Sequence, residues 1–250
     1  MSTSTIRVAT LNCRNVVDRW RKRAPLLIGQ LVDLNPDVIG LQELRHFPSQ
    51  AGLIANKVGV GTGQAHWLHM TYKTGWMWFW EGIGILSRLP IVERDGLRLS
   101  GQNRVANFVR LRLPGGGVLD VYNTHLATGG RELKKAQVET ILQWMAGRPG
   151  TPQVLVGDFN ASPTSPTLQR AYQSLRSAYS VANGAEPART VPTPLRRDAD
   201  ASSGVVMDYI LVNEAVDVHD ARVTFDKASP HDPSVYASDH FGLAATISVR

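Results

Sequence analysis

The stretch QVLVGDFNASP, residues 153–163, decides the fold. Its first half is a short apolar run, rich in valine, that predicts a β-strand. The run ends in Asp158, and Asn160 follows two positions later. A strand end holds side chains rigidly at the edge of a sheet. A carboxylate and an amide at that point therefore indicate a site of polar chemistry.

Similar short apolar runs recur along the chain, and several are rich in valine, isoleucine and tyrosine. Each of them predicts a strand, over residues 6–12, 37–44, 81–87, 107–113, 118–126, 153–160, 206–212, 221–225 and 243–249.

Helical patterns fall between some of these runs. Apolar spacing predicts helices over 25–34 and 132–145, and Ser165-Pro166 is typical of a helix N-terminus. Residues 181–204 are polar, contain proline and glycine, and predict a long surface loop. Many strands with few helices indicate packed sheets with helices outside.

The composition is that of a globular enzyme with a basic surface. The chain has 250 residues, which suits one large domain or two small ones. A net charge of +6 and a pI near 9.7 favour polyanionic partners, with plain solubility as the alternative. The basic clusters Arg19–Arg23 and Arg196–Arg197 are each expected to be solvated faces or loops.

Other sequence features exclude several classes of protein. Cys13 is the only cysteine, so an intrachain disulfide is impossible and a soft-metal site is disfavoured. A strand-like pattern begins at Ile6, which leaves no room for a signal peptide. No run of about 18 apolar residues is present. We therefore expect a cytoplasmic protein without a transmembrane segment, and a monomer by default.

Polar residues cluster at the ends of the predicted strands. Four carboxylates that converged in one pocket would repel each other unless a cation, a shared proton or a histidine compensated them. Mg²⁺ or Mn²⁺ meets that need, because hard cations prefer oxygen ligands. Asp208 lies inside an apolar run, where a hydrogen-bonded structural aspartate is the competing interpretation. The residues concerned are Asn12, Glu43, His125, Asp158, Asn160, Asp208, Asp239 and His240.

These segments, in this order, resemble the endonuclease/exonuclease/phosphatase superfamily, which has the deoxyribonuclease I-like fold. The resemblance implies an α/β fold: a four-layer sandwich of two packed mixed β-sheets flanked by helices, with residues 1–250 as a single domain. The matching segments are TLNCRN (10–15), GLQEL (40–44), EGIGILSRLPI (81–91), NTHLA (123–127), GDFNASP (157–163), MDYILV (207–212) and SDHFGL (238–243).

The resemblance also implies a role for each matching residue. Asp158 would position or deprotonate the attacking water, Asn160 and His125 would contact the phosphate, and Asp208 would support the leaving side or a histidine. His240 would face the phosphate. Glu43 would bind the metal directly, with Asn12 and Asp239 on the metal side and Asp239 also holding the His240 ring. Glu81 sits where some members of the family place a carboxylate that pairs with the active-site histidine, as an outer partner of the site; an exposed glutamate at a strand start is the alternative. Arg104 carries no motif and is expected to be structural or solvated.

The substrate stays open between three hypotheses. A nuclease that hydrolyses phosphodiester bonds of nucleic acid leads, because of the basic charge. A lipid or inositol phosphoesterase, acting on phospholipid or a small phosphorylated substrate, is the alternative, and a non-catalytic binding module is the third. Trp76, Trp78 and Trp80 share one face of an extended stretch. They are expected to pack in the core, to stack on bases or to insert into lipid.

Overall fold

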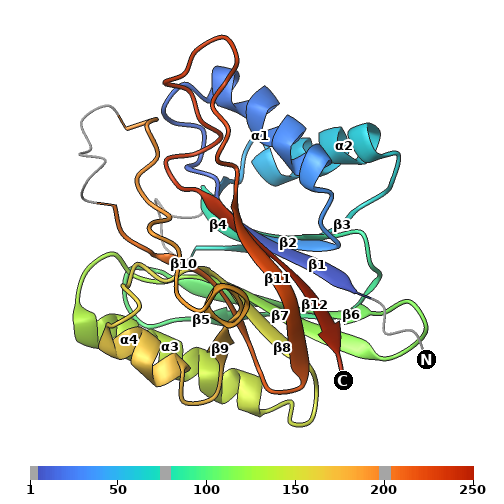
Figure 1. The fold of residues 1–250 in the computed structure, drawn as a ribbon, viewed down its shortest axis with the longest axis vertical. Helices are drawn as coiled ribbons and strands as arrows, with labels where there is room; N and C mark the ends of the chain where they lie inside the picture. Colours follow the sequence, from blue (N-terminus) through green and yellow to red (C-terminus); the bar gives the residue numbers. More distant parts are fainter. Residues whose placement is uncertain (1–4, 74–79, 197–203) are drawn as a thin grey trace.

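The computed structural model describes residues 5–73, 80–196 and 204–250. Two mixed sheets of six strands each pack face to face, and helices cover both outer faces (Figure 1). The α/β four-layer sandwich predicted from the sequence is thereby confirmed. In spatial order, the first sheet consists of β11 (Val216–Thr224), β12 (Gly242–Val249), β1 (Ile6–Asn12), β2 (Val38–Arg45), β4 (Glu81–Ser87) and β3 (Trp67–Tyr72).

The second sheet mirrors the first, since each contains one parallel pair among antiparallel neighbours. The parallel pairs are β1–β2 in the first sheet and β7–β8 in the second. In spatial order, the second sheet consists of β5 (Ile91–Arg98), β6 (Val105–Arg112), β7 (Val118–His125), β8 (Gln153–Asp158), β10 (Asp208–Val212) and β9 (Arg176–Ser177).

The helices form the outer layers. Helices α1 (Trp20–Leu34) and α2 (Gln50–Thr62) cover the first sheet, and α3 (Arg131–Ala146) and α4 (Pro166–Ala171) cover the second (Figure 1). The short α5 (Ala178–Asn183) packs near β11. No helix in the described parts of the chain is long and apolar enough to cross a membrane.

Three apolar layers hold the sandwich together. Val8 and Val156 belong to the layer between the sheets, Leu31 to the layer under α1 and α2, and Ile141 to the layer under α3 and α4. All four side chains are fully buried. Burial of a side chain of this size contributes about 1.5–3 kcal/mol, so these layers fix the positions of the strand ends.

Hydrogen bonds also cross the layer between the sheets. Asn123 on β7 donates to the carbonyl oxygens of Leu41 (3.2 Å) and Gly84 (3.0 Å) in the other sheet. Its own oxygen accepts from Gln42 at 2.7 Å. A Cβ on Gly40 would lie 2.4 Å from Val156 Cγ2, so glycine allows the sheets to approach at this point. These contacts fix the position of one sheet relative to the other, close to the strand ends.

Several elements differ from the sequence prediction. Residues 178–183 form α5, so the start of the loop predicted over 181–204 is helical, while 184–196 is irregular apart from a bridge between Val191 and Val205. Strand β5 is polar and mostly exposed, so its sequence lacks the alternation of apolar and polar residues that would predict a strand. Helix α2 contains three glycines, which are poor helix formers. Strands β3 and β9 were also not predicted.

The basic cluster at 19–23 is not simply a solvated face. Arg23 is fully buried, and its guanidinium donates to carbonyl oxygens of the loop after β1 and to that of Ala237 at 2.8 Å. Arg19 bonds Ser234 through its Nη1 at 2.9 Å. These arginines therefore connect the loop after β1 to the loop before β12 by hydrogen bonds. Trp80 is exposed, at 45%, and so does not pack in the core, whereas Trp76, Trp78 and Arg197 lie outside the described residues.

Candidate active site

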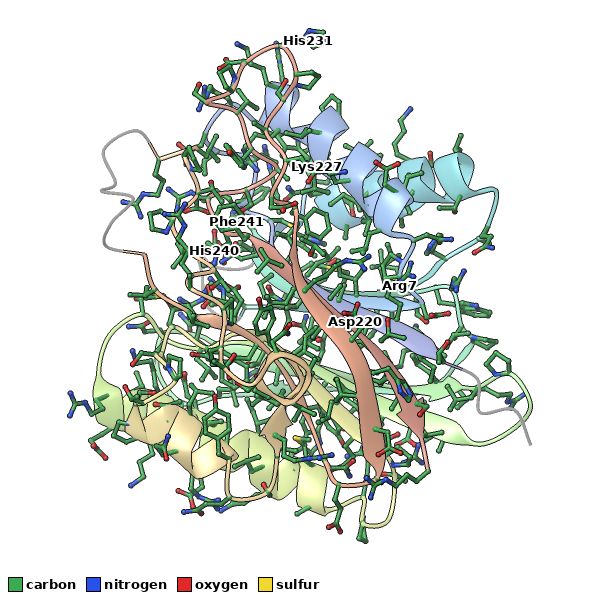
Figure 2. All side chains as sticks on the ribbon, viewed as in Figure 1. Arg7, Asp220, Lys227, His231, His240 and Phe241 are labelled. Carbon is green, nitrogen blue, oxygen red and sulfur yellow. The ribbon has the colours of Figure 1, made fainter. Side chains whose placement is uncertain are left out.

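One edge of the sandwich collects the predicted site residues. Strands β1, β2, β7 and β8 end at this edge, and β4, β10 and β12 begin at it because they run antiparallel to their neighbours. His125 and Asp208 both pair in register with Asp158. Figure 2 places His231 at the tip of the loop between β11 and β12, and His240 near the base of that loop, beside the sheets.

Asp158 lies at the centre of the site and is 1% exposed. Its Oδ2 accepts from Asn12 Nδ2 at 3.0 Å, and its Oδ1 accepts from the backbone N–H of Asn160 at 2.9 Å. The preceding Gly157 has a φ of 145°, and a Cβ there would lie 2.0 Å from the carbonyl oxygen of Thr124. Only glycine permits this close contact between β7 and β8. Burial, followed by the charge of Asp208, raises the pKa of Asp158 to about 7.

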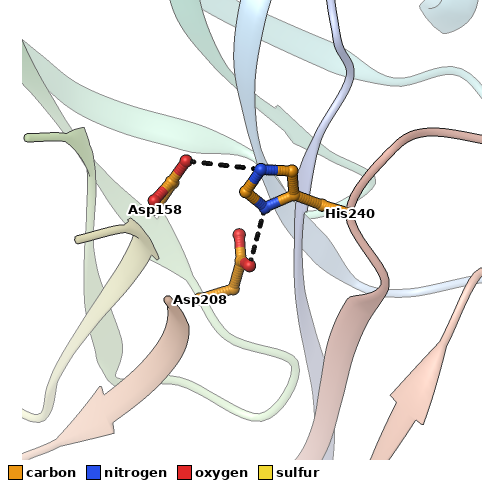
Figure 3. A group of neighbouring side chains, drawn as sticks. All are labelled: Asp158, Asp208 and His240. Atoms are coloured by element: carbon orange, nitrogen blue, oxygen red, sulfur yellow. Dashed lines mark hydrogen bonds and ion pairs between the residues drawn. The ribbon is translucent and has the colours of Figure 1, made fainter. Parts of the chain in front are cut away.

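Asp208 and His240 form a buried pair next to Asp158 (Figure 3). His240 Nδ1 lies 2.9 Å from Asp208 Oδ2, and His240 Nε2 lies 3.9 Å from Asp158 Oδ2. Burial acts to lower the pKa of His240, but the charge of Asp208 and its hydrogen bond outweigh it and raise the pKa to about 10. His240 is therefore an imidazolium at neutral pH.

His125 approaches the same oxygen of Asp158 as His240 does and is in the opposite charge state. Its Nε2 lies 3.6 Å from Asp158 Oδ2, and its Nδ1 is buried without a hydrogen-bond partner. Burial, and then the positive charge of Arg104, hold the pKa of His125 well below its ordinary value. A neutral imidazole here can donate one hydrogen bond to an incoming group.

Glu43, Asn12 and Asp239 line the other side of the site. Asn12 Nδ2 donates to Glu43 Oε1 at 3.1 Å as well as to Asp158, so it links the two carboxylates. Glu43 sits in a bulge of β2 with a φ of 50°. Its pKa is raised by burial and by Glu81. Asp239 is held by Arg14, whose Nη1 lies 3.3 Å from its Oδ2.

The structure does not show Asp239 holding the His240 ring. Asp208 provides the hydrogen bond to that ring, while Asp239 accepts from Ser238 Oγ at 3.3 Å and pairs with Arg14. The reason is geometric, because β10 brings Asp208 opposite Asp158 and the ring of His240 points between them (Figure 3).

Glu81 and Asn160 have other partners at the rim. Glu81 pairs with the buried Lys73 rather than with a histidine. The Nδ2 of Asn160 donates to the carbonyl oxygen of Leu126 at 3.1 Å, while the residue still lines the pocket.

A pocket of about 540 Å³ opens over these groups. Sequence reasoning missed Arg14 and Lys73, and it gave Arg196 no part in the site. Arg14 and Arg196 line this pocket, and Lys73 is buried against Glu81. Arg14 lies within the TLNCRN segment, which is the one signal that would have pointed to it. The pocket is lined by Arg14, Glu43, His125, Thr128, Asp158, Asn160, Val191, Pro192, Arg196, Val205, Met207, Asp239 and His240.

The donor set fits a hard divalent cation. Several carboxylates lie together, and the buried Oδ1 of Asp208 has no hydrogen-bond partner. Asp158, Asp208 and His240 offer ligand atoms within 4.8 Å of one another. However, a metal ligand must be deprotonated, and His240 is charged. The oxygens around Glu43 therefore fit a cation better than the cluster that contains His240.

Comparisons with known proteins agree with this geometry. The model of the endonuclease/exonuclease/phosphatase family matches residues 9–240. Protein angel of Drosophila melanogaster is 27% identical over 221 residues, which cover 77% of this chain and 58% of that protein. The chain thus spans little more than half the length of this curated relative.

Solved structures share the fold across the whole chain. An endonuclease/exonuclease/phosphatase from Bacteroides vulgatus has a TM-score of 0.80 at 19% identity, covering 99% of this chain and 100% of that one. The catalytic domain of human Nocturnin, solved with a bound sulfate anion, has a TM-score of 0.77 at 23% identity, covering 98% and 95%. The extent of the family match leads to one conclusion: the chain belongs to the endonuclease/exonuclease/phosphatase family.

Proposed function

We propose that this protein hydrolyses phosphodiester bonds of nucleic acid, with a divalent metal ion and a water that Asp158 positions. One observation carries the proposal: the same oxygen of the buried Asp158 carboxylate has a neutral His125 within 3.6 Å and a charged His240 within 3.9 Å. Residues 1–250 would act as one domain of this family.

Each residue of the site would have a separate role in the reaction. Asp158, aimed by Asn12 and the backbone of Asn160, orients the water and takes its proton. His240 is held in place and kept charged by Asp208, so it stabilises negative charge that develops on the phosphate. His125 and Asn160 bind phosphate oxygens.

Glu43 would hold the metal, with Asp239 and Asn12 beside it. The set consists of oxygens, which supports Mg²⁺ or Mn²⁺ rather than a softer metal. When bound, such a cation polarises the phosphoryl oxygen and stabilises charge on the leaving oxygen. Arg14 would keep Asp239 ionised and in position.

Nucleic acid is the favoured substrate because the site lies in a basic protein. The net charge is +6, and Arg14 and Arg196 line the pocket. Cations at the rim of a cleft attract a polyphosphate backbone and make binding dependent on salt.

A small or lipid phosphoester is the second candidate. The pocket wall formed by Val191, Pro192, Val205 and Met207 is largely apolar, and this favours a substrate that presents an apolar group next to its phosphate. The two candidates share the same reaction and differ in what flanks the phosphate.

A substrate panel tests the proposal. Plasmid DNA, single-stranded oligonucleotides, sphingomyelin and phosphoinositides are assayed side by side with Mg²⁺, with Mn²⁺ and with EDTA. We expect cleavage of nucleic acid that depends on the metal and weakens with salt. Turnover of lipid alone would transfer the proposal to the second candidate, and full activity in EDTA would refute the metal.

Matched variants connect turnover to the site. Asp158→Asn should abolish turnover, whereas Asp95→Asn, at an exposed strand position, should not change it. His240→Ala should also be inactive, with His219→Ala on β11 as its control. Wild-type rates in both site variants would refute the assignment of the site.

A further inference from the structure

Thr190 is a fully buried residue that contacts the chain on both sides of the Asp208–His240 pair. Its Oγ1 accepts the backbone N–H groups of Met207 at 2.9 Å and of Asp208 at 3.2 Å. Its carbonyl oxygen accepts the backbone N–H of Phe241, the residue after His240, at 2.7 Å. Thr190 is therefore hydrogen-bonded both to the strand that carries the aspartate and to the segment that carries the histidine.

The hydroxyl of Thr190 takes the place of a neighbouring strand at the start of β10. Among the described residues, β9 pairs with Leu211 and Val212 but not with Asp208, so the sheet does not continue on that side of Asp208. A buried backbone N–H needs an acceptor, and Thr190 Oγ1 provides it from a different part of the chain. A side chain thus sets the backbone position from which the Asp208 carboxylate projects.

Thr193, three positions later, joins the same segment to the residues before His240. Its N–H donates to the carbonyl oxygen of Asp239 at 2.8 Å, and its Oγ1 donates to that of Ser238 at 2.6 Å. Thr193 is itself buried, at 1% exposure. Because these bonds hold residues 190–193 against the segment that leads into β12, the hydroxyl of Thr190 is an acceptor in a fixed position.

The residues between the two threonines belong to the active-site pocket. Val191 and Pro192 line it, and a β-bridge joins Val191 to Val205, which lines it as well. The wall of the pocket and the start of β10 are consequently positioned by the same short segment, residues 190–193.

We propose that Thr190 is a positioning residue for the reaction: by accepting the N–H of Asp208, it holds the Asp208 carboxylate within hydrogen-bond reach of His240. The inference rests on the proposed function, and it adds a residue that lies outside the pocket lining. The pair needs such support because Asp208 lies in one sheet, whereas His240 precedes a strand of the other. Their contact is 2.9 Å, so a shift of the carboxylate by about 1 Å would break it.

Thr190→Val tests the hydroxyl, because valine keeps the shape of threonine and removes the acceptor. Thr190→Ser keeps the hydroxyl and should restore most of what valine loses. Thr151→Val is the matched control, since Thr151 Oγ1 donates to the buried Asp120 at 3.0 Å, at the opposite end of β8 from the site. Both valine variants should lose stability, because each removes a hydroxyl bonded to a buried group. Stability alone therefore does not reveal the role of Thr190.

Steady-state kinetics with a double-mutant cycle give the first readout. We expect Thr190→Val to lower kcat by up to about 100-fold, the cost of misplacing a catalytic group by about 1 Å, and Thr151→Val to keep the wild-type kcat. Since Thr190 acts through Asp208, adding Thr190→Val to Asp208→Asn should lower kcat little further. Additive losses would mean that Thr190 acts independently of Asp208, and they would overturn the inference.

The proton NMR signal of the His240 ring Nδ1–H gives a second readout, which needs no turnover. A ring N–H that donates to a carboxylate is protected from exchange and resonates far downfield. Its loss in His240→Ala and in Asp208→Asn identifies the signal. At pH 7 we expect Thr190→Val to lose this signal and Thr190→Ser to keep it. If Thr190→Val does not fold, Thr190→Ala is compared with Thr190→Ser, since only serine retains the acceptor.

Two further results would overturn this inference. One is a folded Thr190→Val with the wild-type kcat and the wild-type His240 signal, and the other is agreement of Thr190→Ala with Thr190→Ser in both readouts. Failure of the proposed function looks different, because the wild type would then turn over no phosphoester. The NMR signal would still decide whether Thr190 positions Asp208.

Discussion

His240 Nδ1 lies 2.9 Å from Asp208 Oδ2, and the two side chains are buried together beside Asp158. The pair joins β10 in one sheet to the loop before β12 in the other. It therefore sets the charge state of the histidine and also spans the two halves of the sandwich.

Replacing Asp208 with Asn should remove the charge that keeps His240 protonated. We expect kcat to fall by about 10²- to 10³-fold, the usual cost of losing one group that stabilises charge in the transition state, while the fold persists. Steady-state kinetics at pH 7 would measure this, with Asp217→Asn, whose side chain on β11 is solvent-accessible and pairs with Arg250, as the control. A variant with nearly full activity would show that Asp208 does not act through His240.

The same pair predicts how stability depends on pH. The pKa of His240 is raised from an ordinary value of 6.5 to about 10. Its contribution is therefore complete below pH 6.5 and is lost as pH rises through about 10. Urea unfolding at pH 6 and pH 10 should show that Asp208→Asn costs more stability at pH 6. An equal cost at both values would contradict the pairing.

The activity should rise with pH across neutrality. Burial and Asp208 raise the pKa of Asp158 to about 7, so its carboxylate is protonated below that value and cannot accept a proton from water. A bound cation favours the ionised form. We expect the lower limb of kcat/KM against pH to lie near 7 at low Mg²⁺ and to move to lower pH at saturating Mg²⁺. If the lower limb of the kcat/KM profile lay at the same pH at low and at saturating Mg²⁺, no metal would bind near Asp158.

Glu43→Gln should weaken metal binding without unfolding the chain. The pKa of Glu43 is already raised by burial and by Glu81, so a neutral side chain is tolerated there. We expect the Mg²⁺ concentration for half-maximal rate to rise by about tenfold or more. Metal titrations of activity and of unfolding temperature would measure this. Glu93→Gln, on the exposed strand β5, serves as the control. If the Mg²⁺ concentration for half-maximal rate were unchanged in Glu43→Gln, Glu43 would not be a metal ligand.

Asn123→Leu should destabilise the whole sandwich. The variant keeps the volume but removes the hydrogen bonds that Asn123 donates to the buried carbonyl oxygens of Leu41 and Gly84, and one of the two that the Gln42 amide donates; the other, to Thr10 Oγ1 at 3.0 Å, remains. Each buried unsatisfied group costs about 1–3 kcal/mol, so we expect a loss of roughly 3 kcal/mol or more. Denaturant unfolding would measure it. A loss below about 1 kcal/mol would mean that the tie between the sheets contributes little.

The sequence predicts the strand ends of the site well, for a physical reason. Asp158 and Asp208 each interrupt or end an apolar run, so both their burial and their position at the edge can be predicted. The pairing of His240 with Asp208 rather than Asp239 depends on strand order and ring direction, which no local pattern encodes.

Arginines were the least predictable residues. Arg23 lies in a run of basic residues that is typical of a solvent-exposed segment, yet it is fully buried among carbonyl oxygens. In the sequence, Arg104 has the pattern of an ordinary turn residue. Its environment is created by Gln137 and Thr128, which lie more than twenty positions away in the chain.

The position of β12 has a consequence for synthesis of the chain. This strand lies between β11 and β1, so residues 242–249 form an interior strand of the sheet to which β1 belongs. A nascent chain that has not yet released residues 239–249 from the ribosome lacks both Asp239 and His240, as well as a neighbour for β1. Hydrolytic activity would therefore emerge only after residues 239–249 have left the ribosome and β12 has paired with β1.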